Sequence, residues 1–170
     1  MARKARSDED TPARLVQTLL RGYAERGVFR SFSAGTTRGG TTPFTMTWHH
    51  GRQFRLVLES ATRTVAFPEL LPGVSARSPM LKELKAFLHP FVTEDVPPHR
   101  RLDPSKAQLK VTARAGNVSL AVVAERGELE YATRRIVHLA QEVFMVFLPD
   151  GPYYDYRVEH LGLDPDAVWA

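Results

Sequence analysis

The chain contains no cysteine among its 170 residues. This absence excludes disulfide bonds, thiolate zinc sites, iron–sulfur clusters and a cysteine nucleophile, and it fits a reducing compartment. The longest strongly apolar run, Val143–Leu148, is far shorter than the roughly 20 residues that span a bilayer. Residues 1–10 lack the apolar stretch of about 7–15 residues that a secretory signal needs. We therefore expect a cytoplasmic protein with no membrane insertion.

Catalytic and cofactor-binding signatures are absent as well. No H-E-x-x-H, G-x-S-x-G or P-loop pattern occurs along the chain. The glycine-bearing segment 35–40 (GTTRGG) fits no phosphate or dinucleotide loop, and it lies between two expected strands instead of opening a helix. The sequence therefore offers no catalytic, cofactor-binding or metal-binding residue, and we expect no cofactor.

Charge is unevenly spread along the chain. The net charge is +4, but residues 11–67 carry eight basic and two acidic groups, whereas residues 150–170 carry one basic and five acidic groups. A basic first half can attract phosphates or acidic protein surfaces. Nucleic-acid binding is therefore one open hypothesis. The sequence lacks interleaved aromatic and basic positions that would read bases, so such binding would be weak and electrostatic.

The first half of the chain predicts one helix followed by strands. Thr11-Pro12 is typical of a helix N-cap followed by proline, and Gly27 is a stop signal, which together predict a helix over 12–26. From Val28 the apolar period changes to two, which indicates strands. The expected strands are 28–33, a segment around Phe44, Met46 and Trp48, a segment around Phe54, Leu56 and Leu58 joined to it by a tight turn at His50-Gly51, and a less certain strand over 62–67.

The second half predicts two helices separated by a loop and a hairpin. Ser78-Pro79 repeats the capping device and opens a helix over 79–89. A long surface loop follows over 92–105, and Gly116-Asn117 divides two alternating strands in the manner of a type II′ turn. A long helix is then expected over 128–148, with a short closing helix capped by Gly162.

These elements predict an α+β fold in which one antiparallel sheet of five to six strands packs against helices. Residues 1–10 have no apolar anchor and are expected to form a disordered tail, and residues 11–170 a single α+β domain. The order α-β-β-β-α-β-β-α over residues 12–148 resembles that of the bacterial YbjN-like proteins and the class I type III secretion chaperones. Secretion chaperones are typically acidic, whereas this chain has a sequence pI near 9.6, so the YbjN-like branch fits better. The resemblance implies a polypeptide-binding protein, commonly a homodimer, and assigns no individual residue.

An aromatic cluster beside the apolar helix end is the first candidate binding surface. Tyrosine is enriched at interfaces, and one helix stripe cannot bury a run as apolar as 143–148. Either another chain covers this run, or the protein's own tail seals the core there. The candidate partner or dimer residues are Phe144, Phe147, Tyr153, Tyr154 and Tyr156.

Three further groups carry weaker chemical signals. His99, Arg100 and Arg101 form a candidate anion-binding loop, although three exposed basic groups are also typical of a solvated loop tip. His49 and His50 are expected to point to opposite faces of a strand, so they would not share a metal ion. His138 and Glu142, spaced i, i+4, predict a hydrogen bond on a helix face.

Composition, order of elements and candidate residues together favour a non-enzymatic protein-binding module. It would be chaperone-like or a regulatory adaptor, and its partner would be another polypeptide, a second copy of itself, or both. A nucleic-acid-associated protein is the alternative. A small enzyme with a dispersed, unrecognised site is a third hypothesis, because active-site residues need not be close in sequence.

Overall fold

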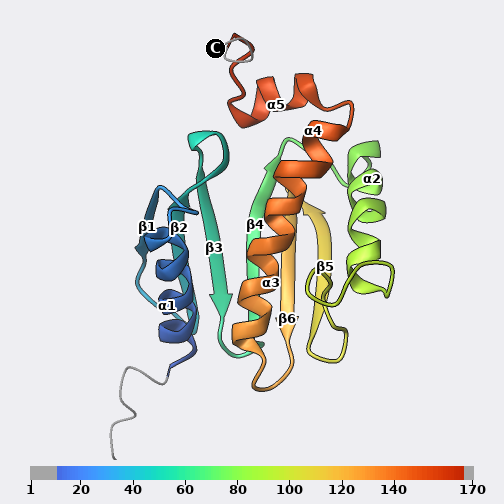
Figure 1. Cartoon of the computed structure of the whole chain (residues 1–170). Coiled ribbons are helices and arrows are strands. Elements are labelled where there is room, and N and C mark those ends of the chain that lie inside the picture. The colour runs from blue at the N-terminus through green and yellow to red at the C-terminus, as the bar shows by residue number, and fades with distance from the viewer. Residues whose placement is uncertain (1–10, 167–170) are drawn as a thin grey trace, which may run out of the picture.

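The computed structural model describes residues 11–166, so the expectations for residues 1–10 and for the last four residues lie outside this range. The described chain forms one six-stranded sheet and helices of very different lengths (Figure 1). The elements are α1 (Pro12–Glu25), β1 (Ser31–Ala34), β2 (Thr41–Thr47), β3 (Gln53–Glu59), β4 (Thr64–Pro72), α2 (Pro79–Leu88), β5 (Ala107–Arg114), β6 (Asn117–Ala124), α3 (Leu129–Glu142), α4 (Leu148–Asp150) and α5 (Tyr154–Leu161).

The sheet confirms the predicted fold class. Its strand order is β1-β2-β3-β4-β6-β5, and every neighbouring pair is antiparallel. The β5–β6 hairpin joins the sheet through β6, which pairs with β4. Strands β1 and β5 are therefore the edge strands. The fold is α+β, and its element order includes the fourth strand before α2.

Both predicted helix starts have the expected caps. The side-chain oxygen of Thr11 accepts a hydrogen bond from the backbone N–H of Arg14, at 3.2 Å. Ser78 accepts one from the N–H of Met80, also at 3.2 Å. In each case proline occupies the first helical position, where its missing N–H costs nothing. These caps fix where α1 and α2 begin.

Three predicted boundaries were wrong, each for a local reason. The first strand begins at Ser31 instead of Val28. The fourth continues through Pro68 to Pro72, because a register shift between Phe67 and Leu71 accommodates the proline in its pairing with β6. The β5–β6 turn residues are Ala115 and Gly116, with φ of 53° and 77°. Two positive φ angles indicate a type I′ turn, not the expected type II′.

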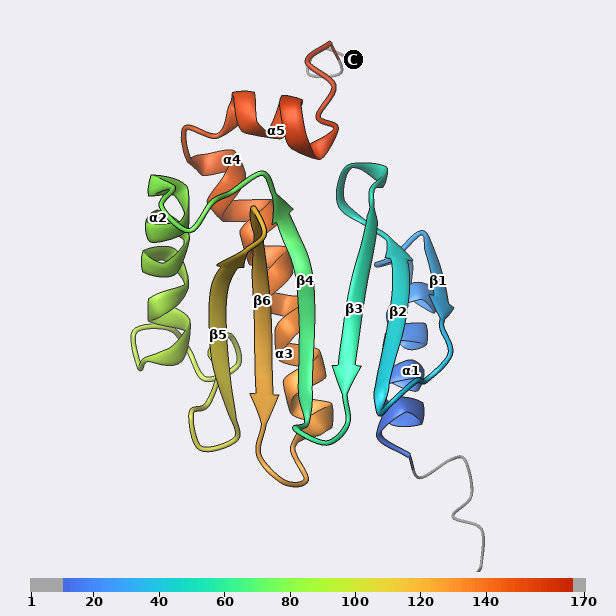
Figure 2. The same ribbon diagram turned by 180° about the vertical axis from the view of Figure 1, so that it is seen from behind.

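The sheet has one covered face and one open face. Cross-strand partners point to the same side. The pairs Phe44↔Leu56, Leu58↔Val65 and Val122↔Val65 therefore place the large apolar side chains together. Helices α1 and α3 lie over this face, as Figure 1 shows, and Figure 2 shows the other face free of helices. That open face carries polar, charged and small residues, among them Ser33, Thr45, Arg55, Val57, Ala66, Ala121 and Lys110.

The long helix predicted over 128–148 is interrupted near its end. Helix α3 stops at Glu142, a π-helical turn spans Val143–Phe147, and α4 follows. The chain then reverses, and α5 crosses the end of the sheet (Figures 1 and 2). Gly162, with φ of 69°, ends α5 as expected. Within residues 11–166, no helix is long and apolar enough to cross a membrane.

Candidate functional site

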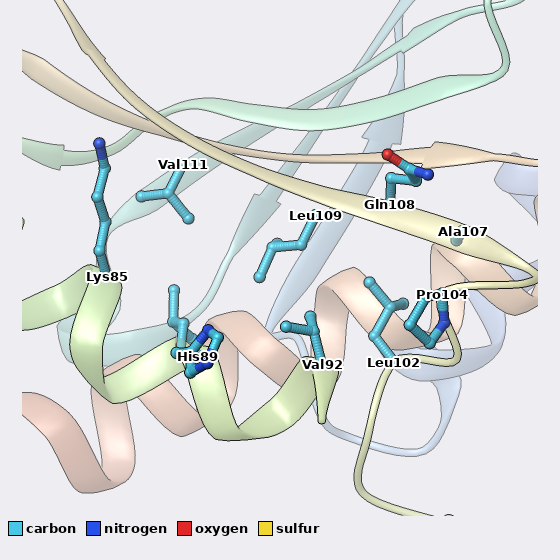
Figure 3. Close-up of a pocket in the computed structure, with 10 residues that line it drawn as sticks. Lys85, His89, Val92, Leu102, Pro104, Ala107, Gln108, Leu109 and Val111 are labelled. Atoms are coloured by element: carbon cyan, nitrogen blue, oxygen red, sulfur yellow. The ribbon is translucent and has the colours of Figure 1, made fainter. Parts of the chain in front are cut away.

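An apolar groove lies between α2 and the edge strand β5. Its volume is about 420 Å³. Figure 3 shows Leu109 and Val111 pointing from β5 toward the helical side, where His89, Val92 and Leu102 face them. The full lining is Lys85, Leu88, His89, Val92, Leu102, Pro104, Ala107, Gln108, Leu109 and Val111. We call this feature the β5 groove.

The helical wall of the groove is rigid. Leu84 and Leu88 of α2 are buried in the main core, with at most 1% of their surface exposed. Pro90 cannot continue the α-helical hydrogen bonding, and the chain tightens into a 3₁₀ turn over His89–Val92. This turn aims His89 and Val92 into the groove, while Phe91 is buried behind them.

The loop that follows this 3₁₀ turn forms the wall at one end of the groove. The sequence predicts a surface loop there. Leu102 is an exception to that prediction, because only 1% of its surface is exposed. Its N–H donates to the carbonyl of Phe91 at 2.6 Å. The next residue, Asp103, donates its N–H to the Tyr131 hydroxyl on α3 at 2.7 Å. The loop is therefore a fixed wall of the groove.

The remaining wall is β5, and it has a free backbone edge. Strands β5 and β6 are joined by a two-residue turn, so Arg114 and Asn117 form the first hydrogen-bonded pair. Non-hydrogen-bonded and hydrogen-bonded pairs then alternate along the two strands. The same alternation holds at the other end of the hairpin, where the N–H of Glu125 donates to the carbonyl of Lys106 at 2.8 Å. The N–H and C=O groups of Leu109, Val111 and Ala113 consequently point away from β6.

No described backbone group pairs with this edge. Among residues 11–166, the only bond that closes it is at its start, where Ala107 donates to Asp103 at 3.1 Å. Unpaired strand edges are templates for another strand. A chain that paired with β5 would place alternate side chains over the groove, because Leu109 and Val111 already point to that side.

The ionisable side chains around the groove are basic. Lys85 and His89 line the groove, and no acidic residue does. On the opposite face of the same strand, Lys110 and Arg114 are exposed. The described ion pairs use none of these four groups. An acidic segment would therefore be attracted to β5 on both of its faces.

Few polar side chains line the groove. Its only neutral polar side chain is the amide of Gln108. No nucleophile with an adjacent base lines it. Within residues 11–166, no group of three or more His, Asp or Glu side chains could hold a metal ion. The arrangement offers a backbone edge, an apolar slot and positive charge.

The structure places the predicted aromatic surface largely inside the protein. Phe144, Phe147 and Tyr153 expose 2%, 8% and 8% of their surface, which fits the interpretation that the protein's own tail seals the core there. Tyr156 is half-buried, and its hydroxyl donates to the carbonyl of Pro72 at 2.5 Å. Of the five residues, Tyr154 alone is well exposed. The protein's own tail covers this helix end.

A contact with α2 holds this cover in place. The Tyr153 hydroxyl donates a hydrogen bond to the carboxylate of Glu83 on α2, and its ring packs on Phe147 at 4.8 Å. Burial, together with this hydrogen bond, raises the pKa of Tyr153. A partner could reach Phe147 only by displacing Tyr153. The outer surface here offers only Tyr154 and Met145, which are 47% and 59% exposed.

The candidate anion loop is tied to α3. Arg100 donates to Glu142 at 3.1 Å, and Arg135 donates to the carbonyl of His99 at 2.5 Å. The carbonyl of Arg101 accepts a bond from Tyr131 at 3.3 Å. Arg100 therefore already has a carboxylate, and the backbone of this loop serves to position the groove wall.

The two histidine candidates have separate environments. His49 stacks on Phe144 at 4.8 Å, and burial, with a smaller effect of His50, lowers its pKa to about 4. His50 has φ of 58° and is exposed, and both residues lie in a 3₁₀ turn over His49–Gly51 instead of on a strand. His138 Nε2 lies 3.4 Å from the Glu142 carboxylate at i, i+4, but it has no hydrogen-bond partner among the described residues, so the predicted hydrogen bond does not form. Burial is the main cause that lowers the pKa of His138, against the opposing effect of Glu142.

Sequence reasoning missed the β5 groove, although two signals pointed toward it. Leu109, Val111 and Ala113 are a weaker apolar series than the Val-Leu-Val series of β6. Basic side chains alternate with them at Lys106, Lys110 and Arg114, which is typical of a protected edge strand. The position of α2 beside that edge was not encoded in any local pattern.

Comparison of the chain with protein-family models, curated protein sequences and solved structures finds no significant match.

Proposed function

We propose that this protein is a non-enzymatic polypeptide-binding module that captures an extended, acidic and partly apolar segment along β5. The observation that carries the proposal is the unpaired backbone edge of Leu109, Val111 and Ala113 directly beside an apolar groove. Strand addition of this kind takes affinity from main-chain hydrogen bonds and specificity from pockets for alternate side chains. A chaperone-like or adaptor role follows, in line with the resemblance of the element order to YbjN-like proteins.

The positive charge around β5 determines which kind of chain can pair with this strand. If a second copy paired its own β5 with this edge, the basic groups Lys110 and Arg114 of both copies would be brought onto one small sheet face. Like charges across neighbouring strands are destabilising. An acidic partner instead places carboxylates near Lys85, Lys110 and Arg114. We therefore assign β5 to a different polypeptide, and any homodimer to another surface.

The test uses synthetic peptides of about eight residues, enough for one strand. One peptide alternates valine with glutamate, and its matched control alternates valine with lysine. Fluorescence anisotropy should show binding of the glutamate peptide that is at least about tenfold tighter than binding of the lysine peptide. Equal affinity for the two peptides, or no binding of either, would sink the proposal.

Two variants at one position separate backbone pairing from side-chain packing. Val111→Pro removes an outward N–H without touching the bonds between β5 and β6, and proline is accepted at such edge positions. Val111→Ala keeps the N–H and loses only side-chain contact. The proline variant should bind the glutamate peptide about tenfold more weakly than the alanine variant. Sedimentation of the free protein shows whether a second copy occupies β5: a dimer that Val111→Pro dissociates would contradict the assignment.

A further inference from the structure

A second hollow adjoins the β5 groove where α2 begins. Its volume is about 590 Å³, and we call it the α2 hollow. Lys85 lines both this hollow and the β5 groove, so the two meet at one side chain. The surface open to a chain bound at β5 therefore continues past the groove. The lining of the α2 hollow is Ala76, Arg77, Ser78, Pro79, Leu81, Lys82 and Lys85.

The α2 hollow lies at the Arg114 end of β5. The loop before α2 is fixed there, because the N–H of Val74 donates to the carbonyl of Gly116 in the β5–β6 turn at 2.9 Å. The side chain of Val74 is buried in the core. Figures 1 and 2 show α2 beside β5, running in the opposite direction. The start of α2 and the end of β5 are thus neighbours.

The charge of the α2 hollow is of one sign. Three basic side chains line it, Arg77, Lys82 and Lys85, and no acidic one does. Within residues 11–166, none of the three takes part in an ion pair. The acidic residue of α2, Glu83, instead accepts a hydrogen bond from Tyr153. The three positive charges are therefore available to carboxylates of a ligand.

The other end of the groove is apolar, and the charge beside it is mixed. Figure 3 shows Leu102 and Pro104 at the start of β5, at the end away from the α2 hollow. Between them in the chain, the carboxylate of Asp103 accepts bonds from the hydroxyl and the N–H of Ser105 at 2.7 and 2.9 Å. The ammonium of Lys106 lies over an aromatic ring of α3, 5.0 Å from its centre. Acidic residues of a ligand are therefore favoured at the α2 end.

The geometry of the sheet indicates the direction of a chain that pairs with β5. Every neighbouring strand pair in the sheet is antiparallel. Antiparallel pairing is also slightly more stable per residue than parallel pairing. An antiparallel partner begins opposite Arg114 and ends opposite Ala107. Its N-terminal residues consequently lie nearest to the α2 hollow.

We propose that the α2 hollow binds a run of acidic residues directly N-terminal to the apolar segment that occupies β5. This inference rests on the proposed strand addition at β5. Arg77, Lys82 and Lys85 receive the carboxylates, while alternate apolar side chains fill the β5 groove. Charges at the rim of an interface select between partners and fix their register. The partner is a polypeptide whose acidic residues precede its strand.

The test compares two peptides of the same composition and opposite block order. Each has about eight residues, enough for one strand. In one peptide a run of glutamates precedes valine alternating with threonine, and in the other the run follows. Acetyl and amide ends remove the terminal charges. Calorimetry should show binding of the glutamate-first peptide that is about tenfold tighter than binding of the glutamate-last peptide.

A double variant tests whether the α2 hollow causes this preference. Arg77→Gln with Lys82→Gln should bind the glutamate-first peptide about tenfold more weakly and the glutamate-last peptide as before. Arg14→Gln with Arg21→Gln is the control matched in charge, because both arginines are exposed on α1, over the opposite edge of the sheet (Figure 1). It should bind both peptides as the unchanged protein does. Urea melts check that both double variants keep their stability.

The outcomes separate this inference from the strand addition on which it rests. If neither peptide binds, strand addition at β5 fails and the inference fails with it. If both bind equally and Arg77→Gln with Lys82→Gln changes neither affinity, β5 still captures a strand, but the role of the α2 hollow is overturned. Tighter binding of the glutamate-last peptide would overturn the antiparallel direction. A single-stranded oligonucleotide that binds about tenfold tighter than the glutamate-first peptide would assign the hollow to nucleic acid instead.

Discussion

Arg100 donates a hydrogen bond of 3.1 Å to Glu142, and this contact joins the loop before β5 to the last turn of α3. The carboxylate of Glu142 is 12% exposed and also lies 3.4 Å from His138. The same loop supplies Leu102 and Pro104 to the β5 groove. A single acidic residue on α3 thus helps to fix the shape of the site proposed to bind polypeptides.

We expect Glu142→Gln to destabilise the protein by about 1 kcal/mol, because it removes a charge-assisted bond from a mostly buried carboxylate. Urea denaturation measures the change. Glu130→Gln is the matched control, since Glu130 pairs with Arg134 at i, i+4 on an exposed surface and should cost about 0.5 kcal/mol or less. Equal effects at the two sites would show that the Arg100–Glu142 contact does not anchor the loop.

The two apolar stripes predicted from the sequence differ in depth, and mutations should reveal it. Ile136 is fully buried, so Ile136→Ala should cost about 2–5 kcal/mol. Phe87 on α2 is only partly buried and packs on Phe91 and Phe147, with 5.7 and 5.2 Å between ring centroids. Phe87→Ala should therefore cost less than the about 3–5 kcal/mol of a fully buried phenylalanine. Chemical denaturation of both variants checks the order.

The sequence predicted those parts of the fold that depend on local signals. The caps at Thr11 and Ser78 and the alternation of Phe44 with Met46 are short-range patterns, and they located α1, α2 and β2. Pro68 was interpreted as a break because the register shift that accommodates it depends on β6, which lies far along the chain. Positive φ at Ala115, likewise, follows from the twist of the whole hairpin.

The groove was beyond local reasoning for the same reason. Periodicity predicted β5 and β6 but not that β6 would pair with β4 and leave β5 at the edge. Nor does the sequence of α2 and of the 3₁₀ turn after it specify that Leu88 and Val92 leave a groove beside Val111. The site results from the order of strands in the sheet, and that order is set by long-range packing.

Stability should fall as the pH is lowered from about 6.5 to about 4, and His49 should be one cause. Its pKa is 6.5 when free and about 4 in the folded protein, because burial against Phe144, and to a lesser degree His50, disfavours its charged form. Between these values the unfolded chain binds a proton that the folded protein does not. The contribution of His49 is fully present above pH 6.5 and is lost toward pH 4.

His49→Phe removes this titration and keeps an aromatic ring against Phe144. Urea melts across this pH range should give a flatter dependence for the variant than for the unchanged protein. An unchanged slope in His49→Phe would show that His49 is not protonated differently in the two states.

The last prediction concerns the helix end at Phe144, where the sequence left two interpretations open. Phe144 is 2% exposed and contacts His49 and Phe54 at 4.8 and 5.2 Å between ring centroids. Phe144→Ser leaves a cavity and buries a hydroxyl, so it should cost at least about 3 kcal/mol. Tyr154→Ser, at a position 47% exposed, should change stability by about 0.5 kcal/mol or less.

Sedimentation of the same two variants at micromolar concentration then tests self-association. If copies meet through the outer surface of Met145 and Tyr154, Tyr154→Ser should weaken the assembly while the fold stays intact. Phe144→Ser should alter assembly only to the extent that it unfolds α5 and the core beneath it. Loss of assembly in Phe144→Ser alone, with stability unchanged, would mean that Phe144 faces a partner and that α5 opens in solution.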